Sequence, residues 1–307
     1  MTEALQGHLP LTHLGVIRAE GDDAAIFLQG QLSNDVQLLP VGQARLAGFL
    51  SAKGRMQASF IVIKRTSTDF WLITSRDVLP ATLKRLSMFV LRAKVKMSDA
   101  TSAVQLLGLA GNAVPAEARD LAPWQTALDG DASVVRLFAA SGDSRALLAA
   151  PADSALPASI TNSPVIHEAT WALSMVQAGV PLITQPLVDA FVPQMVNFES
   201  VDGVSFKKGC YPGQEVVARS QFRGTLKRRM YRVASPTMPT PGQEVFVASD
   251  AEQPVGTVVL AAARTADGFE ALVSMQTNAA GESLHLGSNT GPALQVLTLP
   301  YALKEDI

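Results

Sequence analysis

The sequence contains very little cysteine and few histidines. Cys210 is the single cysteine among 307 residues, and the four histidines are scattered along the chain. One cysteine excludes an intramolecular disulfide and any zinc or cluster site built from several thiolates of this chain. The histidines lack the short spacing that places two imidazoles on one helical face, as histidine metal sites usually require. We therefore expect no bound metal.

Long hydrophobic runs are also missing. Apolar stretches such as 60–63 and 258–263 are far shorter than the roughly 18 residues of a membrane-spanning helix. The first residues carry neither the basic start nor the apolar stretch of a secretory signal. We therefore expect a cytoplasmic protein without membrane contact. Because 48% of the residues are hydrophobic, the chain can bury a large core, and its length favours two or three domains.

Basic residues are concentrated in one segment, although the net charge of the chain is only −2. We call this segment the basic island; it comprises Lys207, Lys208, Arg219, Arg223, Lys227, Arg228, Arg229 and Arg232. Glu215 is the one acid in the segment 206–232 that contains them. Because the whole chain has a net charge of only −2, the rest of the chain is acidic. Such an island indicates an anion-binding site or, alternatively, a solvated surface.

Hydrophobic periodicity predicts an α+β fold. The first lobe is expected to contain a strand at 11–19, a helix from Asp22, three strands at 44–50, 56–64 and 70–74, a helix at 77–92 and a strand at 104–109. This order is typical of a split β-α-β unit. The second lobe is expected to contain a hairpin at 133–140 and 146–150 and a helix at 168–177, which Ala178 and Gly179 end.

Short strands close the sequence. Several prolines around 236–241 mark a linker, and the strands expected beyond it suggest a small β-barrel, at 244–248, 256–261, 270–274 and 293–297. We divide the chain into a first lobe at 1–110, a second lobe at 111–232 with the cysteine, and a barrel at 233–307. The first two lobes can share segments.

The lone cysteine lies in a turn among charges. Gly209 and Gly213 bracket Cys210, and the residues after Pro212 can enter a helix, which places the thiol near a helix N-terminus. The lysine pair and the helix dipole both favour the thiolate form. Alternatively, the cysteine packs as a small hydrophobic residue. No histidine is near in sequence, so the residues support acyl transfer only weakly, and one-carbon capture or a partner contact is an equal alternative.

Five ordered motifs resemble one known family. They are FLQGQL at 27–32, AKGR at 52–55, FVPQMVN at 191–197, SFKKGCYPGQE at 205–215 and FRGTLKR at 222–228. Together they resemble the YgfZ family of folate-binding proteins, which is related to the glycine-cleavage T-protein. The resemblance covers most of the chain, and the cysteine motif is its most specific part.

The resemblance implies both fold and function. It implies two ferredoxin-like α+β lobes and a C-terminal β-barrel around a central hole that binds tetrahydrofolate or a derivative such as 5-formyl-tetrahydrofolate. It further implies support of iron–sulfur enzymes, including those that thiolate tRNA, with any cluster held by the partner. On this basis the working face is expected at Cys210, Lys208, Tyr211, Gln214 and Glu215, and the folate wall at Trp171, Gln177, Leu14, Asn197, Arg219 and Arg223.

Individual positions qualify this resemblance. The indole of Trp171 could stack on the pterin or aminobenzoyl ring, or it could be an ordinary core residue. Gln177 replaces the glutamate of the T-protein Glu-Ala-Gly turn, and Leu14 replaces an aromatic residue of some relatives, so folate affinity is expected to be reduced. Near Gln57 the acidic pair of T-proteins is missing, which argues against glycine-cleavage activity.

Three functions compete. The first is a folate-binding accessory protein for the assembly or repair of iron–sulfur enzymes, the second a folate-dependent one-carbon transferase, and the third an RNA-binding module. Because no RNA-binding motif accompanies the basic island, direct nucleic-acid binding is not expected. We expect the basic island to face the mouth of the folate pocket, where it would meet the glutamate carboxylates.

Overall fold

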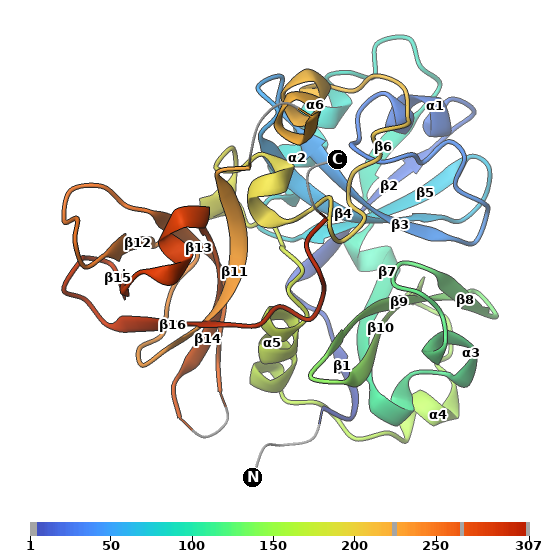
Figure 1. Ribbon diagram of the computed structural model, residues 1–307. Helices are drawn as coiled ribbons and strands as arrows, with labels where there is room; N and C mark the ends of the chain where they lie inside the picture. Colours follow the sequence, from blue (N-terminus) through green and yellow to red (C-terminus); the bar gives the residue numbers. More distant parts are fainter. Residues whose placement is uncertain (1–4, 223–225, 265–266, 305–307) are drawn as a thin grey trace.

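The computed structural model describes residues 5–222, 226–264 and 267–304. Two antiparallel sheets and a closed barrel make up the fold, and Figure 1 shows them grouped around the helix α5 (Glu168–Gln177). The prediction of two α+β lobes followed by a C-terminal β-barrel is confirmed. None of the described helices combines the length and the hydropathy that crossing a membrane requires.

The first sheet has the strand order β3-β4-β5-β2-β6. Its elements are β2 (Leu14–Glu20), α1 (Ala24–Gln29), β3 (Ala44–Leu50), β4 (Met56–Lys64), β5 (Asp69–Ser75), α2 (Leu79–Ser87) and β6 (Lys96–Asp99). Successive side chains of a strand point to opposite faces. Phe60 therefore packs with α1 and α2 on one face, while Ile61 and Ile63 point to a core shared with the second sheet.

The second sheet has the order β1-β7-β10-β9-β8. Two of its strands, β1 and β7, come from the two ends of the segment 1–110. Its elements are β1 (Gly7–Pro10), η1 (Thr101–Ala103), β7 (Val104–Ala110), η2 (Gly111–Ala113), α3 (Ala116–Arg119), β8 (Thr126–Asp129), β9 (Ala132–Ala140), β10 (Asp143–Pro151) and α4 (Ala158–Thr161). Its outer face packs on α3 and α4. The three sequence segments remain our proposed division of the chain, with strands crossing between the first two.

The barrel closes through β11-β14-β13-β12-β15-β16. The elements after α5 are η3 (Gln185–Leu187), η4 (Pro193–Val196), α6 (Gln214–Phe222), β11 (Arg228–Ser235), β12 (Glu244–Val247), β13 (Gly256–Ala263), β14 (Phe269–Gln276), η5 (Thr277–Gly281), β15 (Leu284–Leu286) and β16 (Ala293–Leu297). One face of α5 packs on β13 and β14, so this helix joins the barrel to the sheets.

Most expected elements form where the sequence indicates them, but one helix is too long in the prediction. The helix predicted over 77–92 ends at Ser87, because the following residues turn and leave Met88, Phe89 and Leu91 exposed. The helix expected at 168–177 and the strands at 44–50 and 56–64 have the predicted bounds. Strands β1, β6, β8, β11 and β15 are additional.

Candidate functional site

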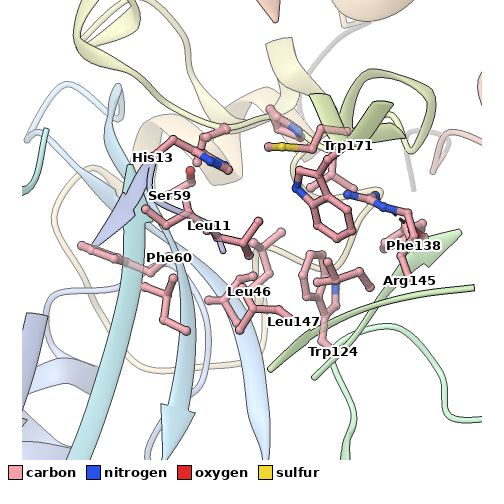
Figure 2. A pocket seen from close by; sticks show the side chains of 18 residues that line it. Leu11, His13, Leu46, Ser59, Phe60, Trp124, Phe138, Arg145, Leu147 and Trp171 are labelled. Atoms are coloured by element: carbon pink, nitrogen blue, oxygen red, sulfur yellow. Dashed lines mark hydrogen bonds between the residues drawn. The ribbon is translucent and has the colours of Figure 1, made fainter. Parts of the chain in front are cut away.

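A largely apolar cavity of about 90 Å³ lies between the two sheets. Figure 2 shows side chains from both sheets converging on it, among them Leu46 and Ser59 from the first and Phe138 and Leu147 from the second. Both sheets turn an apolar face inward, so this core contains a space that side chains do not fill. Concave apolar sites with a few polar groups are the usual form of small-molecule sites.

The indole of Trp171 forms one wall of the cavity. Trp171 lies on α5 and is only 3% exposed. Gly108 makes room for it, because a Cβ at that position would lie 2.7 Å from two indole carbons. Trp124 forms another wall, and its Nε1 donates a hydrogen bond of 2.8 Å to the carbonyl oxygen of Val201. A flat ligand can therefore meet two aromatic side chains here.

Two buried N–H groups of the cavity wall lack partners among the described residues. They are the indole Nε1 of Trp171 and the Nε of Arg145. The Arg145 guanidinium lies over the Trp171 ring, 4.5 Å from the ring centroid, and only a long hydrogen bond of 3.4 Å joins its Nη1 to the carbonyl oxygen of Phe138. Burial and the neighbouring cation of Arg136 lower the pKa of Arg145 to about 9. Unpaired buried donors are costly, and both of these belong to residues of the cavity wall.

A wider cleft of about 510 Å³ adjoins the cavity and shares His13, Trp171, Met175 and Leu182 with it. Both sheets, α5 and Leu260 of the barrel contribute to the cleft, so all three units of the fold meet there. Desolvation lowers the pKa of His13, and the carboxylate of Glu168 partly opposes this. The imidazole is therefore mainly neutral at pH 7. The cavity therefore forms the apolar part of the site, and the cleft forms its more polar part.

The residues expected to form a folate wall occupy different places. Leu14 and Trp171 line the cavity. Gln177 does not line it, because its Oε1 accepts a hydrogen bond of 2.8 Å from Ser141 in the β9–β10 turn. Asn197 is fully buried and holds β11 through two hydrogen bonds with the backbone of Met230.

The cysteine loop forms a second, separate feature. Cys210 is exposed, and α6 begins four positions later with Gln214. Glu215 is exposed on the first turn of this helix. Residues 208–213 do not line the cavity or the cleft. The structure therefore separates the thiol from the apolar cavity.

Lys208 anchors this loop. Its side chain is buried, and its Nζ donates hydrogen bonds of 2.5 Å to the carbonyl oxygens of Gln29 and Leu32 at the end of α1. The ammonium also lies 4.8 Å from the ring centroid of Tyr211. Burial lowers the pKa of Lys208 to about 8 and raises that of Tyr211 to about 12. Both residues position the loop that presents the thiol.

The basic island is dispersed over several contacts. Arg229 pairs with Glu199 in the interior, and Arg232 pairs with Glu270 in the barrel. A groove of about 870 Å³ beside α6 is lined by Arg219, Lys227 and Arg228. Arg223 lies outside the described residues. None of the described island residues lines the cavity or the cleft, so the structure separates the island from this site.

A carboxylate lies where the sequence shows none. The Nε2 of Gln57 donates to the carboxylate of Asp189, at 3.2 Å from its Oδ2. Asp189 has φ +61, and its N–H donates to the carbonyl oxygen of Met56. A residue far along the chain therefore brings an acid to the position expected to lack one.

Sequence reasoning missed the main polar groups of the cavity. Arg145, Trp124 and His13 carried no motif. Arg145 did carry a signal, because it is a charged residue at the start of the apolar run 146–150. Among the described residues, no three His, Cys, Asp or Glu side chains gather closely enough to hold a metal ion.

Comparisons with known proteins now add to this geometry. The family described as GCVT N-terminal domain matches residues 6–135. The tRNA-modifying protein YgfZ of Serratia proteamaculans is 30% identical over 320 residues, covering 97% of this chain and 95% of that protein. The tRNA-modifying protein YgfZ of Edwardsiella ictaluri is 31% identical over 316 residues, covering 96% and 94%.

A solved structure shares the fold. The glycine cleavage system aminomethyltransferase T from Bartonella henselae superposes with a TM-score of 0.69, at 18% identity, over 99% of this chain and 88% of that one. This likeness establishes the T-protein-like fold. Given the full-length match to the two YgfZ proteins, the chain belongs to the YgfZ family.

Proposed function

We propose that this protein binds a tetrahydrofolate in the cavity and the adjoining cleft, and that it acts as an accessory protein in the assembly or repair of iron–sulfur enzymes. The names of its relatives support an indirect link to tRNA modification. The observation that carries the proposal is the apolar cavity at Trp171 with its unpaired N–H groups.

The wall residues fit a folate. A pterin is flat and carries ring nitrogens and a carbonyl oxygen, so it can meet both the aromatic walls at Trp171 and Trp124 and the free donors. Its glutamate carboxylates are strongly hydrated and would remain in the cleft, because burying them in an apolar cavity is costly. Arg76 and His13 line that cleft and could meet them.

Tryptophan fluorescence tests this placement. We expect 5-formyl-tetrahydrofolate to quench the emission, and the Trp171→Phe variant to lose much of that quenching. Trp71 provides the matched control, since it lies on β5 under Arg65 and does not line the cavity, so Trp71→Phe should keep the response. No quenching and no thermal shift at millimolar ligand would refute folate binding at this site.

The iron–sulfur part of the proposal depends on the exposed thiol. Cys210 is the only sulfur nucleophile of the chain, and it is presented on an anchored loop. A partner enzyme can therefore reach it without opening the cavity. In cells lacking the protein, wild type should restore iron–sulfur enzyme activity and tRNA thiolation. Failure of wild type to restore either activity would refute the accessory function.

Asp189 favours a second candidate function, a folate-dependent one-carbon transferase. Its carboxylate beside Gln57 could manage a proton, which T-protein chemistry requires. A transferase would release a one-carbon unit from its folate, and Asp189→Asn should slow this release without weakening folate binding. Absence of turnover in wild type would leave the accessory function alone.

A further inference from the structure

We propose that Arg145 and Trp171 form a donor-only recognition site that selects ligands carrying an oxygen acceptor on the buried ring. This inference deepens the proposed function and rests on it. Arg145 is therefore a specificity residue of the cavity, and the feature it recognises on a folate is the C4 carbonyl of the pterin.

No acid among the described residues compensates the charge of Arg145. The side chain is 3% exposed, and no carboxylate of the described residues forms an ion pair with it. The charge that acts on it is another cation, Arg136, whose Nη1 donates to the backbone carbonyl oxygen of Arg145. Burying a cation beside another cation is unfavourable unless an electron-rich group approaches it. The Arg145 side chain lines the cavity, so a ligand in the cavity can approach it.

Both unpaired groups are donors. Arginine has no acceptor, and the indole nitrogen of Trp171 can only donate. The remaining polar side chains of the cavity are His13 and Ser59, and the Oγ of Ser59 already accepts the N–H of Ile183. Gln177, which could have paired with the amino edge of a pterin, bonds Ser141 instead. The part of the wall formed by Arg145 and Trp171 therefore matches a ring oxygen better than a ring amino group.

The stacked arrangement also fixes the geometry. The guanidinium lies over the face of Trp171, and Figure 2 shows it between the indole and Phe138. The guanidinium of Arg145 is the charged donor of this pair. A carbonyl oxygen of a ligand can accept from it, and a hydrogen bond to a charged donor is the stronger kind.

The 4-oxo and 4-amino forms of tetrahydrofolate provide the probe. C4 carries an acceptor oxygen in the first and a donor amino group in the second, and the neighbouring N3 changes from a donor to an acceptor. We expect wild type to bind the 4-oxo form about 10- to 100-fold more tightly, the usual range for a charge-assisted hydrogen bond. Arg145→Met should bind both forms equally. The control is Arg136→Met, which removes the neighbouring cation without touching the cavity wall and should keep the preference.

A stability measurement distinguishes a ligand-binding role of Arg145 from a packing role. If Arg145 serves a ligand, Arg145→Met should leave the melting temperature of the unliganded protein unchanged or raise it by about 2 °C, since it removes an unpaired buried charge. A fall in that melting temperature together with an equal loss of affinity for both forms would assign Arg145 a packing role and overturn the inference. Retention of the 4-oxo preference in Arg145→Met would overturn it as well.

These outcomes remain distinct from failure of the proposed function. If wild type binds neither form, folate binding and the inference both fall. If wild type binds both forms with equal affinity, folate binding stands and only the donor-site inference fails.

Discussion

Replacement of Lys208 by methionine tests how the cysteine loop is held. The structure shows a buried ammonium that closes the loop onto the end of α1 through two carbonyl oxygens, those of Gln29 and Leu32. Methionine has nearly the same length and can fill the space, but it cannot donate. The preceding residue, Lys207, is exposed and provides a matched control in the same loop.

The expected loss follows from the two hydrogen bonds. A hydrogen bond from a charged group contributes about 1.5–3 kcal/mol net, and removing the donor leaves buried carbonyl oxygens unsatisfied. Relief of the buried charge offsets part of this loss. We therefore expect Lys208→Met to lower the free energy of unfolding by about 2–4 kcal/mol, whereas Lys207→Met should change it by less than about 0.5 kcal/mol.

Urea unfolding at pH 7 measures this difference, and the rate of thiol labelling at Cys210 reports on the loop itself. Labelling should accelerate in Lys208→Met, because the loop loses its attachment to α1. Equal unfolding free energies for Lys208→Met and Lys207→Met would show that the two hydrogen bonds contribute nothing net, and the reasoning would be refuted.

The same lysine predicts a pH dependence. Burial lowers its folded pKa to about 8, below the usual 10.5. Between these values the unfolded chain binds more protons than the folded chain, so stability due to this group rises with pH through that window. The difference in unfolding free energy between wild type and Lys208→Met should therefore grow from pH 8 to pH 10.5. A difference that shrinks over this window would contradict the assigned direction.

Three further substitutions have expected outcomes. Cys210→Ser should leave the melting temperature almost unchanged yet fail to restore iron–sulfur enzyme activity in cells lacking the protein, because the thiol is exposed and its loop does not depend on sulfur; full restoration would return it to a passive role. Glu199→Gln should cost about 3–5 kcal/mol in urea unfolding, since it leaves the buried Arg229 without its counter-ion. Gly213→Ala should lower the melting temperature strongly, because φ is +80 and its Cβ would meet backbone 2.5 Å away, whereas Gly209→Ala, with nothing within 4 Å, should have little effect.

The regular elements were predictable wherever burial and periodicity agreed. The helix Glu168–Gln177 has both an apolar face and a clear stop at Gly179, and its bounds match the prediction. The strand Arg228–Ser235 was hidden, because it contains three of the arginines that drew attention as a charged surface, although Arg229 is buried and the other two are half-buried. Pairing with β14 and β16 overrides that composition, and only tertiary contact reveals such pairing.

The candidate site was predictable only in part. Leu14 and Trp171 could be placed through the resemblance, and both line the cavity. Arg145 belongs to the site through the strand register of β10, which turns its side chain inward over the ring of Trp171. Asp189 reaches Gln57 across more than a hundred residues. Neither relation leaves a local pattern, so the sequence alone cannot predict these contacts.

The cavity and the cysteine loop are linked through one hairpin, and this arrangement predicts how far they depend on each other. Strands β3 and β4 line the cavity with Leu46 and Ser59, while their turn at 51–54 packs against Gly213 at the start of α6. Yet residues 208–213 do not line the cavity, so a modified thiol should not obstruct a ligand there. We expect alkylation of Cys210 with iodoacetamide to leave the affinity for 5-formyl-tetrahydrofolate within about twofold of wild type while abolishing support of iron–sulfur enzymes. The Cys210→Ser variant controls for labelling elsewhere. A loss of folate affinity that follows alkylation would place the thiol in the ligand site and favour the transferase over the accessory protein.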